Sequence, residues 1–124
     1  MNYRDDIRKR LIEVAKKGSK ISYKELMDEF CLARGGHPSA KNRVGDVVGD
    51  ISNFEHSNGR PLISSVVVHK NNGYPGSGFF GLDGIPEQLR RTEKSFKNPL
   101  SLDDKKFVQE EQKRVWDWWK KHDP

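Results

Sequence analysis

The chain has 124 residues, of which 33% are hydrophobic and 33% are charged, and its formal net charge is +5 at pH 7. A chain of this length is expected to form one domain with a single core, and no apolar run approaches the ~20 residues of a membrane-spanning helix. Its single cysteine, Cys31, excludes an intrachain disulfide and a multi-cysteine zinc site. We therefore expect one cytoplasmic domain over residues 1–124.

The positive charge is concentrated at the start of the chain. Residues 1–24 hold eight Lys/Arg and three Asp/Glu. Such an excess favours a polyanionic partner, nucleic acid above all, and Arg4 and Arg8 would then face it. The alternative is an ordinary solvated basic face.

The first half of the chain predicts three helices. Ile7, Leu11, Val14 and Ala15 recur at helical spacing in a segment that ends at Gly18. Ser22 and Glu25 have the spacing of a capping box, which predicts a second helix from Tyr23 to Phe30. Ser39 can cap a third helix, and its predicted buried stripe consists of Val44, Val47, Val48, Ile51 and Phe54.

The segment RPLISSVVVHKNNGYPGSGFFGLD, residues 60–83, predicts a β-hairpin. Leu62-Ile63 and Val66-Val67-Val68 are typical of a buried strand. Asn71-Asn72-Gly73 fits a tight turn because Asn and Gly tolerate a positive φ. Phe79-Phe80 would form the returning strand.

The remainder predicts a wrapping segment and a last helix. Leu100-Ser101-Leu102-Asp103-Asp104 resembles a helix start, and Phe107, Val108, Val115, Trp118 and Trp119 can dock against the core. The predicted fold is therefore α+β: a small winged-helix-like domain with three helices and a β-hairpin wing in residues 1–82, followed by a wrapping segment and a C-terminal helix in 83–124.

Local motifs add a family resemblance over residues 21–80. Ile21-Ser22-Tyr23-Lys24-Glu25-Leu26 and His37-Pro38-Ser39-Ala40-Lys41-Asn42-Arg43-Val44-Gly45 resemble two segments of the winged-helix DNA-binding domain of O6-alkylguanine-DNA alkyltransferases and alkyltransferase-like proteins. Pro61, Val66-Val67-Val68 and the Gly73–Gly78 loop follow in the family's order. The RPLIS…VVV…PGxGFF pattern is also similar to that of small bacterial proteins.

The resemblance implies DNA binding without alkyl transfer. It places Tyr23 beside the DNA backbone and Lys41, Asn42 and Arg43 on the recognition helix. The position of the reactive cysteine falls on Leu62, Ile63, Ser64 or Ser65, and none of these is a thiol.

Two further departures concern the recognition helix. The family's arginine finger matches Asn42, and Arg43 is displaced by one residue, which is about 100° around a helix axis. Asp46 and Asp50 would repel phosphates.

No catalytic constellation, cofactor site or metal site is predicted. Ser65 and His69 share a face of the predicted strand, but their Cα atoms would be roughly 13 Å apart, so a hydrolase would need Ser64 or Ser65 to meet another histidine. The Tyr74–Gly78 loop lacks the lysine and the helix start of a phosphate-binding P-loop. The four histidines lack ligand spacing.

Two functions remain open at this stage. The first is a non-enzymatic protein that binds DNA mainly through phosphates. Its candidate contacts are Tyr23, Lys41, Asn42, Arg43, Lys70, Arg4 and Arg8. The second is a protein-binding module, such as an immunity or inhibitor protein of a bacterial or phage conflict system, with the Trp116–Trp119 helix as a partner surface.

Overall fold

The computed structural model describes residues 3–32, 43–91 and 99–122. Its helices and strands, in chain order, are α1 (Tyr3–Lys16), β1 (Ile21–Ser22), α2 (Tyr23–Phe30), α3 (Val44–Ser57), β2 (Val67–Val68) and α4 (Leu102–Lys121). Three short 3-10 helices, η1 (Ile63–Val66), η2 (Ser77–Gly81) and η3 (Glu87–Leu89), complete these segments. The combination of helices with a small sheet confirms the α+β class.

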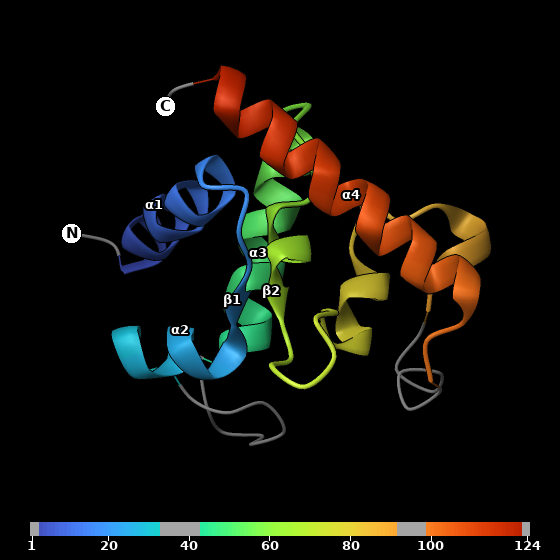
Figure 1. Cartoon of the computed structure of the whole chain (residues 1–124), viewed down its shortest axis with the longest axis horizontal. Helices are drawn as coiled ribbons and strands as arrows, with labels where there is room; N and C mark the ends of the chain where they lie inside the picture. Colours follow the sequence, from blue (N-terminus) through green and yellow to red (C-terminus); the bar gives the residue numbers. More distant parts are fainter. Residues whose placement is uncertain (1–2, 33–42, 92–98, 123–124) are drawn as a thin grey trace.

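The small sheet lies in the middle of the molecule (Figure 1). Its two strands are parallel, with Ile21 opposite Val67 and Ser22 opposite Val68. Figure 1 shows α1 and α2 on one side of this pair, α3 against it and α4 running across one end. The sheet therefore joins the entry to α2 with the chain that follows α3.

The predicted first helix is confirmed, and its end has a clear cause. Ile7 and Leu11 are fully buried, as the helical spacing predicted. Gly18 has a φ of +65° and donates its N–H to Ala15 O, while Ser19 donates to Val14 O. This pair of bonds is the Schellman arrangement, in which glycine supplies the left-handed residue.

The second helix is confirmed at both ends. The side chain of Ser22 accepts the backbone N–H of Glu25 at 3.1 Å, so Ser22 is the N-cap. Cys31 closes the helix with a φ of 55° and is exposed. The capping prediction for Ser39 lies outside the described residues, within which α3 begins at Val44. The prediction that Phe54 is buried is wrong, since it is 52% exposed.

The predicted strand over Leu62–Val68 is wrong for its first part. Ile63–Val66 form the 3-10 helix η1, and only Val67 and Val68 form a strand. Side chains here satisfy the backbone: Glu111 accepts the N–H of Leu62 at 2.8 Å and Ser52 accepts that of Ser64 at 2.7 Å. Because these groups already have partners, no neighbouring strand is needed.

The returning strand of the hairpin is also wrong. Phe79 and Phe80 lie in the 3-10 helix η2, and both are buried. In a strand, adjacent side chains point to opposite faces, so two neighbouring phenylalanines could not enter one core. The turn itself is confirmed: Gly73 has a φ of +75°, and its N–H is donated to His69 O. A closed loop stands where the wing hairpin was expected.

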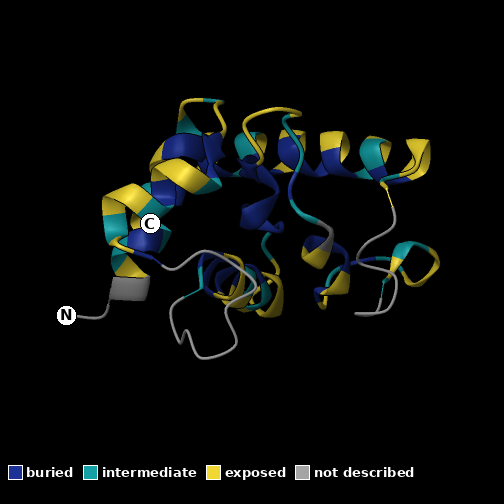
Figure 2. Cartoon of the chain, turned by 90° about the horizontal axis from the view of Figure 1, so that it is seen from below, coloured by how far each residue is buried: buried dark blue, intermediate teal, exposed yellow. Residues whose placement is uncertain are grey.

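Two groups of buried side chains hold the fold together, and α4 contributes to both. Val115 and Trp119 pack in the group centred on α1, α2 and α3, whereas Val108 packs with Phe79 and Phe80. Figure 2 shows the buried residues gathered along the inward sides of the helices. The predicted C-terminal helix is thus confirmed as part of the core.

The start of α4 carries a capping box. The side chain of Ser101 accepts the N–H of Asp104, and the Asp104 carboxylate accepts the N–H of Ser101.

None of the helices in the described part of the chain is both long enough and apolar enough to cross a membrane.

Candidate functional site

A pocket of about 1110 Å³ lies between α2, α3 and the chain from β2 to η2. Its size suits a small ligand or a group such as a nucleobase. Segments far apart in the sequence form its wall: the first turn of α2, one face of α3, and the loop after β2. The lining residues are Ser22, Tyr23, Lys24, Met27, Val44, Gly45, Asp46, Val48, Gly49, Asp50, Asn53, Ser64, Val68, His69, Lys70, Gly76, Gly78, Phe79 and Leu82.

Tyr23 fixes the loop to the start of α2. Its hydroxyl oxygen accepts the backbone N–H of Gly76 at 2.8 Å, and its ring lies 4.9 Å from the His69 ring. Burial raises the pKa of Tyr23, and the hydrogen bond from Gly76 offsets part of that rise. The phenol is therefore neutral at ordinary pH.

Gly76 is suited to this close approach. A Cβ at this position would lie 3.3 Å from His69 Nε2 and 3.5 Å from the Tyr23 hydroxyl oxygen. The glycine therefore lets the loop backbone come within hydrogen-bonding distance of Tyr23. The glycine-rich character of the loop predicted a turn, but not this contact.

Two serines lie together at one side of the pocket. Ser52 of α3 is fully buried, and its hydroxyl oxygen is 2.6 Å from that of Ser64, which is 4% exposed and lines the pocket. Ser52 also accepts the backbone N–H of Ser64. Sequence reasoning considered Ser64 at the position of the missing thiol and as a hydrolase nucleophile. It missed the pairing with Ser52, because nothing in the spacing of the two residues predicts it.

Charges of both signs border the pocket. Lys24 and Lys70 are exposed, and neither makes an ion pair within the described residues. Asp46 lines the pocket from the first turn of α3, and its carboxylate lies 2.9 Å from Arg43 Nε. Asp50 lines the same wall. The cationic groups therefore come from α2 and the loop, and the carboxylates come from α3.

The structure brings together only some of the predicted contact residues. Tyr23 and Lys70 line the pocket, and Arg43 directly precedes the α3 wall. Lys41 and Asn42 lie outside the described residues, and for Arg4 only the backbone within α1 is described. Their predicted contacts with nucleic acid stay predictions.

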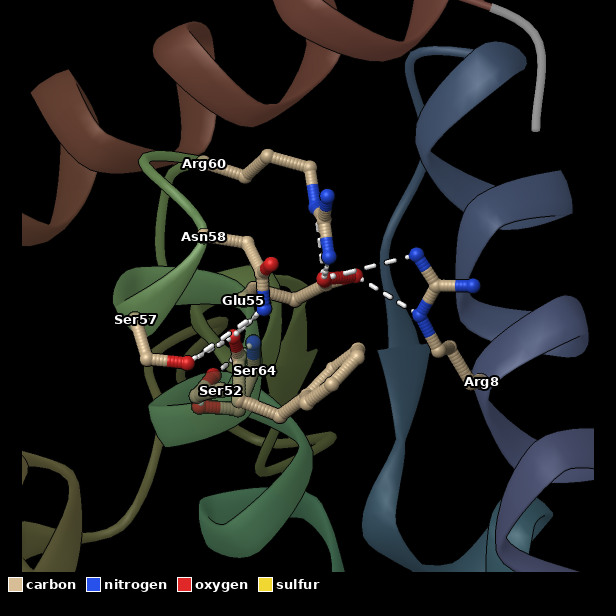
Figure 3. Close-up of polar contacts among 8 residues, drawn as sticks. Arg8, Ser52, Glu55, Ser57, Asn58, Arg60 and Ser64 are labelled. Atoms are coloured by element: carbon tan, nitrogen blue, oxygen red, sulfur yellow. Dashed lines mark hydrogen bonds and ion pairs between the residues drawn. The ribbon is translucent and has the colours of Figure 1, made fainter.

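Arg8 has a structural role that sequence reasoning did not predict. Its Nε donates to Glu55 Oε1 at 2.8 Å, and Arg60 donates to Glu55 Oε2 at 2.8 Å (Figure 3). Glu55 is completely buried, so its charge needs compensation, and the guanidinium groups of Arg8 and Arg60 both pair with it. The sequence did not predict this network. The buried face of α3 was predicted from its apolar residues alone, and Glu55 is not one of them.

Part of the basic face of α1 is therefore engaged in ion pairs with other helices. Arg8 is bound to Glu55, and Arg10 forms an ion pair with Glu29 of α2 at 3.0 Å. The contact of Arg8 with a phosphate chain stays a prediction, and in the structure its charge holds α1 to α3. Arg10 in turn links α1 to α2.

The three tryptophans of α4 divide their roles. Trp119 is buried. Trp116 is partly buried and donates its ring N–H to Ser19 O at 2.9 Å, and Trp118 stacks on His122 at 3.8 Å between ring centroids. The helix thus retains a partly exposed aromatic side at Trp118.

Among the described residues no three His, Cys, Asp or Glu side chains are arranged to hold a metal ion. The side chain of Ser64 hydrogen-bonds only Ser52 within these segments, and no histidine. Cys31 ends α2 outside the pocket lining.

Comparisons of the chain with protein-family models, with curated proteins and with solved structures found no match. The resemblance to alkyltransferase-like domains therefore rests on the residues quoted above alone.

Proposed function

We propose that this chain is a small, non-enzymatic, winged-helix-like protein that binds nucleic acid through the face around the pocket. One observation carries the proposal. Tyr23, the first turn of α3 and Lys70, which are separated by about 20 to 50 residues in the sequence, border a single pocket. The described residues of the two helix motifs that line it are Ser22, Tyr23, Lys24, Val44 and Gly45.

The proposed contacts with nucleic acid are of two kinds, lysines that bind phosphates and a loop in the position of a wing. Lys24 and Lys70 take phosphates, because they are exposed and unpaired among the described residues. The loop from His69 to Gly76, held by Tyr23, takes the place of the expected wing hairpin. Lys41, Asn42 and Arg43 remain candidate contacts at the start of the proposed recognition helix.

Contacts made mainly to phosphates have a measurable signature. Each neutralised phosphate releases counterions, so affinity falls steeply as the salt concentration rises. The test is fluorescence anisotropy of labelled duplex and single-stranded DNA, titrated with the protein at about 50 and 200 mM salt. Micromolar or tighter binding that weakens strongly at the higher salt supports the proposal, whereas failure to bind at the lower salt rejects it.

A second candidate function is a protein-binding module. Phe54 is 52% exposed on α3, and the guanidinium carbons of Arg8 and Arg60 each lie 5.6 Å from the centre of its ring. Exposed aromatic and arginine side chains are typical of interface hot spots. A tight complex with one protein, weakly dependent on salt and lost on Phe54→Ala substitution, would favour this function over the first.

A further inference from the structure

The hydroxyl groups of Ser52 and Ser64 can be assigned donor and acceptor roles. Ser52 is 0% exposed, and its side chain has two contacts: it accepts the backbone N–H of Ser64 at 2.7 Å and lies 2.6 Å from Ser64 Oγ. A serine hydroxyl has one proton to donate. Since a buried donor left without an acceptor is costly, Ser52 donates to Ser64 Oγ.

This assignment leaves the proton of Ser64 without an acceptor. The side-chain oxygen of Ser64 has no contact other than Ser52 among the described residues. Ser64 also lines the pocket, whereas Ser52 does not. The unused donor therefore belongs to a residue that borders the pocket.

The other residues that line the pocket determine the surroundings of that donor. Met27, Val48, Phe79 and Leu82 supply apolar surface, and Lys24 and Lys70 supply positive charge. Apolar walls with a few placed polar groups are typical of sites that bind a ring-sized group.

We propose that Ser64 is a specificity-determining residue whose hydroxyl donates a hydrogen bond to a ring carbonyl in the pocket, next to a phosphate held by Lys24 and Lys70. The assignment of the phosphate rests on the proposed nucleic-acid function. The donor role of Ser64 does not, because it follows from the hydrogen bonds alone. The ring carbonyl can come from a base within a nucleic-acid chain or from a free nucleotide-like molecule.

A pair of small probes isolates the hydrogen bond. 4-Acetylphenyl phosphate carries a carbonyl acceptor, and 4-isopropenylphenyl phosphate has nearly the same planar shape with a C=CH₂ group in place of the carbonyl. Both are titrated into the ¹⁵N-labelled full chain and followed by amide NMR shifts. We expect the acetyl compound to bind about three- to tenfold more tightly, as one neutral hydrogen bond provides.

The matched variants are Ser64→Ala and Ser65→Ala. Ser65 is the adjacent residue and is 0% exposed. It does not line the pocket, and its hydroxyl has no hydrogen-bond partner in the described part of the chain. Ser64→Ala should abolish the preference for the acetyl compound, and Ser65→Ala should preserve it. Equal binding of the two probes to the unmodified chain overturns the inference even if Ser64→Ala does not fold. So does a preference that survives in Ser64→Ala, or no binding of either probe at about 10 mM.

Competition separates this inference from the proposed function. If the acetyl compound displaces labelled DNA, the carbonyl acceptor and the nucleic acid share the pocket, which supports both the inference and the proposed function. If the probe preference is present but the chain binds no DNA, the proposed function fails and the role of Ser64 stands. If DNA binds and the probes are not distinguished, the proposed function stands and the role of Ser64 is overturned.

Discussion

The hydroxyl oxygen of Tyr23 lies 2.8 Å from the backbone nitrogen of Gly76 and accepts its hydrogen bond, joining the first residue of α2 to the loop that leads into η2. This bond is the direct link between two walls of the pocket. The family resemblance predicts Tyr23 as a contact to the DNA backbone. In the structure the Tyr23 hydroxyl positions the loop.

Tyr23→Phe should destabilise the chain and loosen the loop. The substitution retains the ring and leaves the Gly76 N–H without its acceptor, which costs about 1–2 kcal/mol. Urea unfolding measures the loss in free energy, and amide exchange at Gly76 measures the loosening. Tyr74→Phe is the matched control, because the exposed Tyr74 hydroxyl accepts from Gln109 at 2.8 Å and its loss should cost about 0.5 kcal/mol or less. Equal effects of the two variants would contradict a special role for Tyr23.

Glu55→Gln should be far more damaging than an equivalent change at the surface. Glu55 is buried between Arg8 and Arg60, and removing its charge leaves two guanidinium groups without compensation at a cost of about 3–5 kcal/mol. The control is Glu29→Gln, which breaks the exposed pair with Arg10 and should cost about 1 kcal/mol or less. Similar unfolding free energies for the two variants would show that the buried network does not hold α1 to α3.

Asp104→Asn should change how stability depends on pH. Burial by itself raises the pKa of Asp104, but hydrogen bonds from Ser101 and Arg91 outweigh it and lower the pKa below its usual value. A carboxylate with a depressed pKa contributes stability above its unfolded pKa of about 3.9, and the contribution is lost as the pH falls through the folded value. The variant should therefore be less stable than the parent chain by about 1–3 kcal/mol at pH 7. A difference in urea unfolding that is the same at pH 7 and well below pH 4 would refute this.

Asp46→Asn should strengthen binding to DNA if the proposed face is correct. Asp46 borders the pocket and pairs with Arg43 at 2.9 Å, so its removal deletes a negative charge and frees a positive one. We expect affinity to rise roughly two- to fivefold at low salt and the gain to shrink as salt screens the charges. Asp117→Asn, on the exposed side of α4, provides the control and should leave affinity unchanged. Unchanged or weaker binding by Asp46→Asn would contradict the proposed face.

The helices could be predicted from the sequence because their signals are local. Ser22 caps α2 and Gly18 ends α1 through bonds to residues within one or two turns. The hairpin prediction failed because side chains distant in the sequence determine the backbone conformation of this segment. Glu111 and Ser52 accept the N–H groups of Leu62 and Ser64, and this replaces a strand with η1.

The site was predictable only in part for the same reason. Tyr23 was named from the resemblance and Lys70 as a candidate contact near the expected wing, and both line the pocket. Two contacts depend on how α3 packs: Ser52 with Ser64, and Arg8 with Glu55. The spacing of these residues in the sequence does not predict either contact.

The most direct test of the account is the DNA affinity of a double charge reversal, Lys24→Glu with Lys70→Glu, beside the matched reversal Lys106→Glu with Lys113→Glu. Both pairs are exposed lysines, but α4 contributes no residue to the pocket lining. Anisotropy at about 50 and 200 mM salt should show that the first pair abolishes binding and that the control keeps it with nearly the original salt dependence. Equal binding by both variants would contradict the claim that nucleic acid binds around the pocket.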